Sequence, residues 1–225
     1  MLNERVDLRS RDVLVESEQD MMTGVAKTSP NLSLALPNIL TYARIVAVPI
    51  VVGCIYAQSI MNYPLWLRWV AVVIFIAAGV TDFLDGYFAR VWGQQSAFGM
   101  MLDPIADKLL VSACLLMLAA DGIIHGWTLW AAIIILCREI LVSGLREYLA
   151  ALRVSVPVTR LAKWKTTIQL VAIGFLLAGE AGDMVVPVVT QIGLLLLWAS
   201  AIFTIYTGYD YFRAGIHHLI KEDEG

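Results

Sequence analysis

The sequence has 225 residues, of which 59% are hydrophobic, and its formal net charge at pH 7 is −3. Soluble domains average about 45–50% apolar residues, so the excess indicates an integral membrane protein. The small net charge does not favour a nucleic acid as partner. The three cysteines have no CxxC spacing, which argues against both a disulfide framework and a zinc site.

Residues 1–36 differ from the rest of the chain, because they mix charges of both signs and contain no long apolar run. A secretory signal has a basic start followed by about 7–15 apolar residues, and no such pattern is visible. We therefore expect this segment to be a cytosolic N-terminal tail that is partly disordered or forms a surface helix.

Six apolar segments follow, each near the length of about 20 residues with which a helix crosses a bilayer. They cover residues 38–58, 65–89, 104–121, 127–149, 164–180 and 185–211. Short Gly-containing turns separate the third from the fourth segment and the fifth from the sixth, which is typical of antiparallel neighbours. The sequence therefore predicts an all-α membrane protein, with a six-transmembrane-helix bundle over residues 37–213 and a C-terminal tail at 214–225.

The basic residues predict how the bundle is oriented, since Lys and Arg are enriched on cytosolic loops. One side of the bundle carries Arg68 and the acids Asp121, Glu180 and Asp183. The other side carries most of the basic residues: Arg44, Arg90, Lys108, Arg146, Arg153, Arg160, Lys163, Lys165, Arg213 and Lys221. Both termini are therefore expected in the cytosol.

Four aspartates lie where the second predicted span ends and the third begins: Asp82, Asp85, Asp103 and Asp107. Within each pair the spacing of three or four residues places both acids on one helix face, so pairs on adjacent helices can converge. Converging carboxylates repel one another unless a cation is present, and acids in spans usually mark a site. Their chemistry suits hard divalent cations such as Mg²⁺, two of which can clamp a phosphoryl group.

Each of these features also has a simpler interpretation. Asp103 before Pro104 is the pattern of a helix N-cap followed by proline at the first helical position, with the third span starting there. Asp85 and Gly86 form a dipeptide that is common in turns. A lone Asp82 can pair with a neighbouring arginine, for which Arg90 is the nearest candidate.

The run DFLDGYFARVWGQQSAFGMMLDPIAD resembles the signature D-x2-D-G-x2-A-R-x8-G-x3-D-x3-D of the CDP-alcohol phosphatidyltransferases at every defined position. The resemblance implies a six-helix membrane fold, usually homodimeric, with a polar cavity that opens to the cytosol. It also implies that Asp82, Asp85 and Asp103 hold metal. Asp107 is then the base that takes the proton from the attacking hydroxyl, and it also contacts metal.

The same resemblance assigns further positions to the CDP nucleotide and its diphosphate. They lie in the signature and in the segment PNILTYAR at 37–44, which precedes the first span. The assigned residues are Asn38, Thr41, Asp82, Gly86, Ala89, Arg90 and Gly99.

Three segments are similar to the bacterial branch of this family that makes phosphatidylglycerophosphate. They are PNILTYAR at 37–44, CREILVSGLREYLA at 137–150 and AKWKTTIQ at 162–169. The resemblance implies transfer of a phosphatidyl group from CDP-diacylglycerol to sn-glycerol 3-phosphate, with two Mg²⁺ or Mn²⁺ ions. It places the enzyme in the bacterial inner membrane, with membrane lipid and a second copy as partners and its site facing the cytosol.

Basic residues between positions 138 and 165 are the candidates for binding the acceptor phosphate, because arginine can grip a phosphate with two hydrogen bonds. Glu139, Ser143 and Arg146 share one face of the fourth span, and Arg138 lies deeper in that span than a residue at its end. A simpler reading is that these basic residues attract anionic lipid heads or, for Arg138, pair with a buried acid. The assigned residues are Arg138, Ser143, Arg146, Lys163 and Lys165.

Two alternative functions stay open at this point. The first is a family member that uses another acceptor, such as inositol phosphate, serine or another alcohol, because one sequence does not define the shape of the acceptor pocket. The second is a cation channel or carrier whose acids line an ion path. A carrier typically places its site near the membrane midplane, and this reading leaves the clustering of the four aspartates at one membrane face unexplained.

Overall fold

The computed structural model describes residues 36–92, 97–151 and 160–223, and these residues form six α-helices. For some residues near the helix ends, among them Asp85, Arg90 and Lys163, only the backbone is described. The predicted N-terminal tail lies outside the described residues. The helices are α2 (Leu36–Ser59), α3 (Trp66–Trp92), α4 (Ala97–Ala120), α5 (Thr128–Ala151), α6 (Arg160–Asp183) and α7 (Val189–Asp223).

The described residues are helical apart from short turns, as predicted, and each predicted span corresponds to one of their helices. Three of these helices are long and apolar enough to cross a membrane, over Ile39–Ser59, Thr128–Ala150 and Val189–Tyr209. Many large apolar side chains point outward from the helices, for example Val73, Leu116 and Leu195, which are each more than 60% exposed. Such exposure is unusual for a soluble monomer and fits contact with lipid.

The junction between the second and third spans differs from the prediction. α3 continues to Trp92 and α4 begins at Ala97, so the loop is shorter than predicted. Asp103 and Pro104 therefore lie inside α4, and the interpretation of Asp103 as an N-cap is wrong. Residues 97–102 are mostly good helix formers, and a proline inside a membrane helix is tolerated. The turn interpretation of Asp85 is also wrong, because α3 continues through it.

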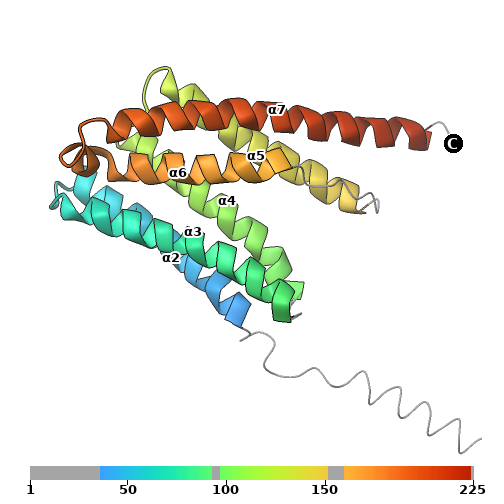
Figure 1. The fold of residues 1–225 in the computed structure, drawn as a ribbon, viewed down its shortest axis with the longest axis horizontal. Helices are drawn as coiled ribbons and strands as arrows, with labels where there is room; N and C mark the ends of the chain where they lie inside the picture. The colour runs from blue at the N-terminus through green and yellow to red at the C-terminus, as the bar shows by residue number, and fades with distance from the viewer. Residues whose placement is uncertain (1–35, 93–96, 152–159, 224–225) are drawn as a thin grey trace, which may run out of the picture. The chain divides into compact units, whose positions relative to one another are not determined.

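The helices pack as two closely associated pairs, α2 with α3 and α6 with α7, as Figure 1 shows. α4 packs against α2 and α6, while α5 packs mainly against α7. The core between them is made of buried apolar side chains from each helix, including Val51, Ile55, Leu118, Ile135, Ile173 and Leu197. α7 continues to Asp223, into the region that we expected to be the C-terminal tail.

A buried polar cluster lies where α2 ends, α3 begins and α4 ends. The Arg68 guanidinium of α3 pairs with the carboxylate of Asp121, which directly follows α4, and its Nε donates to the side chain of Gln58 on α2. The helix α6 breaks locally at Gly179, whose φ is 44° and ψ −128°. A Cβ atom at Gly179 would lie 2.6 Å from Nη1 of Arg68. Because glycine has no side chain, the α6 backbone can approach the guanidinium here.

Candidate active site

Asp82 and Asp107 meet at one buried side chain, the guanidinium of Arg44 on α2. Nη1 of Arg44 lies 2.8 Å from Oδ1 of Asp82 and 3.2 Å from Oδ1 of Asp107. Asp82 comes from the second half of α3, and Asp107 comes from α4. The Arg44 side chain is 0% exposed, whereas those of Asp82 and Asp107 are 35% and 46% exposed. The two acids therefore share one buried cation, while their own side chains are partly exposed.

Asp103 is held by a second residue of α2. The hydroxyl of Thr41 donates a hydrogen bond to Oδ1 of Asp103, and Thr41 is almost completely buried. Thr41 and Arg44 are three residues apart and so occupy one face of α2. That face contacts three of the four predicted aspartates, while the side chain of Asp85 lies outside the described part of the chain.

Arg44 is the residue of this site that sequence reasoning missed. From the sequence it is only one of the basic residues that predict the orientation, and Arg90 is the candidate partner in the simpler interpretation of Asp82. One feature of the sequence could have indicated that Arg44 belongs to the site. It lies in PNILTYAR, one turn after Thr41, in a helix that is mostly apolar. The side chain of Arg90 lies outside the described residues, so the expected pair with Asp82 stays untested.

Two polar contacts connect α4, α5 and α6 beside this site. Nζ of Lys108, the residue after Asp107, donates to the hydroxyl of Ser143 on α5. Nζ of Lys165 on α6 donates to the carboxylate of Glu139 on α5, and Lys165 is only 3% exposed. Lys108 thus connects the helix that carries Asp107 to the segment predicted to bind the acceptor.

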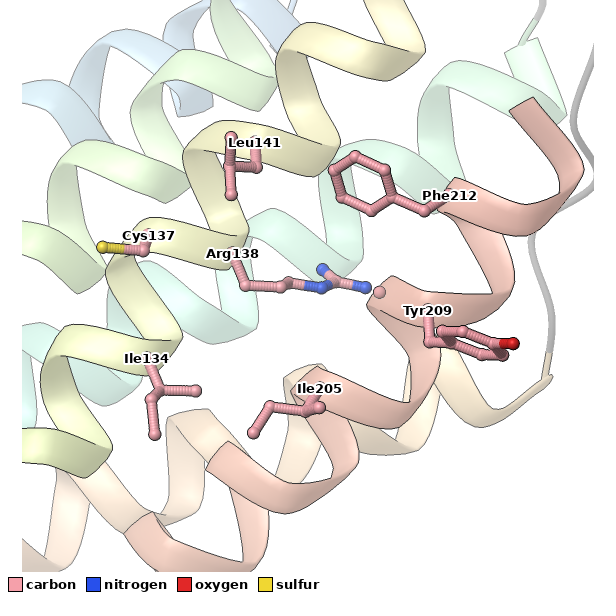
Figure 2. A pocket seen from close by; sticks show the side chains of 8 residues that line it. Ile134, Cys137, Arg138, Leu141, Ile205, Tyr209 and Phe212 are labelled. Carbon is pink, nitrogen blue, oxygen red and sulfur yellow. The ribbon is translucent and has the colours of Figure 1, made fainter. Parts of the chain in front are cut away.

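Arg138 extends from α5 toward α7, as Figure 2 shows. Its Nε donates to the carbonyl oxygen of Thr204 at 3.2 Å, and its Nη2 donates to the hydroxyl of Thr207 at 2.9 Å. Nη1 lies 3.7 Å from the carboxylate of Glu139. The guanidinium lines a cavity of about 360 Å³ between α5 and α7, whose other lining residues are Ile134, Cys137, Leu141, Ile205, Gly208, Tyr209 and Phe212.

For the remaining predicted residues, the structure gives either the exposure or the backbone alone. Arg146 is exposed on α5, and Gly99 is buried near the start of α4. The side chains at four other positions lie outside the described part of the chain, and these are Asn38, Ala89, Arg90 and Lys163. Within the described residues, no three His, Cys, Asp or Glu side chains gather closely enough to hold a metal ion.

A profile of the CDP-alcohol phosphatidyltransferase family matches residues 34–206, which is most of the chain. The chain belongs to the CDP-alcohol phosphatidyltransferase family. It is therefore an enzyme of the phosphatidyltransferase class, and the resemblance seen in the signature is confirmed. The match begins just before α2 and includes all four aspartates, Arg44 and the segments of α5 and α6 that carry Arg138 and Lys165.

Three relatives that this chain resembles carry the name CDP-diacylglycerol–glycerol-3-phosphate 3-phosphatidyltransferase. One from Rickettsia bellii is 45% identical over 179 residues, covering 80% of this chain and 94% of the relative. One from Cereibacter sphaeroides is 39% identical over 224 residues, covering 85% and 100%. One from Haemophilus influenzae is 38% identical over 190 residues, covering 82% and 95%.

Proposed function

We propose that this enzyme transfers a phosphatidyl group from CDP-diacylglycerol to sn-glycerol 3-phosphate and so produces phosphatidylglycerophosphate and CMP in phospholipid biosynthesis. The names of relatives that are 38–45% identical over nearly their whole length support this reaction. The observation that carries the proposal is that one face of α2, through the buried residues Arg44 and Thr41, contacts Asp82 of α3 and Asp103 and Asp107 of α4.

The donor atoms of this cluster fit hard divalent cations. They are carboxylate oxygens from two helices, and the side chains of Asp82 and Asp107, which contact one nitrogen of Arg44, are partly open. Mg²⁺ in proteins binds one or two carboxylates together with substrate phosphates. Under this proposal two Mg²⁺ or Mn²⁺ ions are held by Asp82, Asp85, Asp103 and Asp107. When bound, the ions would offset the charge of the diphosphate.

The reaction then needs one proton acceptor and one leaving group. The acceptor hydroxyl oxygen forms a bond to the phosphatidyl phosphorus, and the bond from that phosphorus to the CMP oxygen breaks. Asp107 takes the proton of the hydroxyl, directly or through one water. Its side chain is 46% exposed, which leaves room for the hydroxyl to approach. Arg44 keeps the carboxylate oriented while it accepts the proton.

Substrate binding is assigned to two groups of residues. The nucleotide and diphosphate contact Asn38, Thr41, Asp82, Gly86, Ala89, Arg90 and Gly99, and the acceptor phosphate contacts Arg138, Ser143, Arg146, Lys163 and Lys165. The bond between Lys108 and Ser143 supports this division, since it joins the helix that carries Asp107 to the proposed acceptor segment. Lys165, another residue of the acceptor group, pairs with Glu139 on α5, the helix that also carries Ser143.

The proposed setting is the bacterial inner membrane, with six spans, both termini in the cytosol and the site open to the cytosol. Lipid chains would enter sideways between helices, and a homodimer is the expected assembly. The excess of Lys and Arg on the side that carries the signature supports the orientation. The bacterial relatives support the choice of membrane.

The test is CMP release by the purified enzyme with CDP-diacylglycerol and, in parallel, sn-glycerol 3-phosphate, inositol phosphate or serine as acceptor. We expect CMP release that requires Mg²⁺ or Mn²⁺ and is fastest with sn-glycerol 3-phosphate. Faster release with another acceptor would refute the assigned acceptor and retain the family reaction. Absence of release with every acceptor would refute the proposed reaction, and release that a chelator leaves unchanged would refute the metal requirement.

A further inference from the structure

Arg44 is a permanent positive charge that contacts two carboxylates from two different helices. The guanidinium stays protonated in proteins, and here the whole side chain is buried under α3 and α4. One nitrogen, Nη1, reaches both Asp82 at 2.8 Å and Asp107 at 3.2 Å. One atom of α2 therefore connects α3 and α4 through two ion pairs.

Thr41 extends the same contact surface by one helical turn. Its hydroxyl donates to Asp103, which is four residues before Asp107 on α4. Asp103 and Asp107 lie on one face of α4, and both are held from the same face of α2. The contacts of Thr41 and Arg44 thus reach both acids of this face of α4 and one acid of α3, Asp82.

Carboxylates that share a small volume repel one another, and each can rotate to avoid its neighbours. The positive charge of Arg44 offsets the repulsion. The contacts of Arg44 and Thr41 with one oxygen of each acid also limit the rotation of the carboxylates. Residues outside a metal's own ligands commonly orient the ligands in this way, and removing one typically lowers metal affinity or activity about 10–100-fold. Arg44 fits such a role, because it is fully buried and contacts two acids that are themselves partly open.

We propose that Arg44 and Thr41 are positioning residues that orient the carboxylates of Asp82, Asp103 and Asp107 for the binding of divalent cations. The inference rests on the proposed function, because it assumes that these carboxylates serve metal-assisted transfer. It reassigns Thr41 from a nucleotide contact to a residue that acts through Asp103. It also gives Arg44 a role that is distinct from orientation of the protein in the membrane.

Arg44→Gln is the main variant, and the first readout is binding of Mn²⁺ alone to the purified protein, followed by electron paramagnetic resonance. We expect the apparent Kd for Mn²⁺ to rise about 10–100-fold. We expect kcat to fall at least about tenfold, while KM for sn-glycerol 3-phosphate changes by less than about threefold. If Arg44 merely competed with the cation for the acids, its loss would tighten Mn²⁺ binding, so unchanged or tighter binding would overturn the proposal.

Arg68→Gln is the matched control, since it removes the other buried arginine from the far ends of the same helices. It should lower thermal stability and leave Mn²⁺ affinity and kcat per folded molecule unchanged. A change in Mn²⁺ affinity equal to that of Arg44→Gln would show a general loss of structure and overturn the specific role of Arg44.

Two further variants keep the proposal testable if Arg44→Gln does not fold. Arg44→Lys retains the charge and should recover part of the Mn²⁺ affinity, and Thr41→Val removes only the hydroxyl and should weaken Mn²⁺ binding to a smaller extent. Wild-type affinity in both variants would contradict the proposal. Failure of the wild-type protein to bind Mn²⁺ would instead refute the proposed metal requirement itself, so the two failures are distinguishable.

Discussion

Two buried arginines, Arg44 on α2 and Arg68 on α3, have nearly the same burial and different surroundings. Arg44 is 1% exposed and Arg68 is 2% exposed. The partners of Arg44, Asp82 and Asp107, have side chains that are 35% and 46% exposed, whereas the partner of Arg68, Asp121, is 4% exposed. The Arg44 cluster is therefore open on the side of its acids, and the Arg68 cluster is closed.

This difference separates a cluster suited to chemistry from one suited to holding helices together. Open carboxylates can exchange a cation or a proton with a ligand, while a closed pair contributes only to the folded state. The Arg68 cluster contacts α2 through Gln58, the end of α4 through Asp121 and α6 through Gly179. We therefore expect changes at the open cluster to affect turnover and changes at the closed cluster to affect stability.

The largest effect is expected from Asp107→Asn at the open cluster. Loss of a general base typically lowers the rate about 10²–10⁴-fold, so CMP release should fall at least about 100-fold. The variant should still bind CDP-diacylglycerol and unfold near the wild-type temperature. Asp121→Asn is the matched control at the closed cluster, and it should lower the melting temperature while kcat per folded molecule stays unchanged. Wild-type turnover in Asp107→Asn would remove Asp107 from the mechanism.

The next effect is expected from Arg68→Gln at the closed cluster. Removing one partner of a buried ion pair typically costs about 3–5 kcal/mol, because the other charge stays buried. Equilibrium unfolding in mixed micelles measures this loss. The double variant Arg68→Met with Asp121→Leu removes both charges and should recover most of the stability. An Arg68→Gln protein as stable as wild type would show that the pair does not hold these helices together.

A smaller effect is expected from Gly179→Ala at the break in α6. The positive φ of 44° disfavours a side chain, and the new Cβ would lie 2.6 Å from Nη1 of Arg68. Strain of this kind costs about 1–3 kcal/mol. The control is Gly174→Ala in the same helix, where the nearest atom is 4.0 Å away and alanine is the better helix former. Equal melting temperatures for both variants would exclude strain at Gly179.

The smallest effect concerns Asp183, which follows the closed cluster along α6. Thr190 donates its backbone N–H to Oδ1 of Asp183 at 3.0 Å. Hydrogen bonds from Thr190 lower the pKa of Asp183 below its ordinary value of 3.8. The charged form therefore stabilises the fold above this value, and the contribution is lost as pH falls through the lowered pKa. The melting temperature of wild type should exceed that of Asp183→Asn at pH 6, and the difference should shrink below pH about 4; a difference independent of pH would contradict this assignment.

Hydropathy was sufficient to predict the helices, because about 20 consecutive apolar residues are needed to span a membrane and leave a clear pattern. The start of α4 was predicted too late because Pro104 is common at the first position of a helix, and here it lies inside one. The signature also predicted a site at Asp82, Asp103 and Asp107 from local spacing, and one face of α2 contacts all three acids.

The contacts of the two arginines were not predictable from the sequence. Arg44 meets Asp107 across 63 positions, and Arg68 meets Asp121 across 53 positions. Such pairs depend on which helix faces which, and basic residues near span ends have a simpler explanation in the orientation rule. The break at Gly179 was hidden for the same reason, because its glycine is required by a side chain of a distant helix.

The most direct test of the central claim is to follow both products of one reaction in vesicles that contain the purified enzyme and CDP-diacylglycerol. Labelled sn-glycerol 3-phosphate is added with Mg²⁺, and CMP release is compared with the label that enters the lipid. We predict equal amounts of the two products and loss of both when Mg²⁺ is chelated. CMP release without labelled lipid, or labelled lipid formed at the same rate in the Asp107→Asn enzyme, would contradict the account.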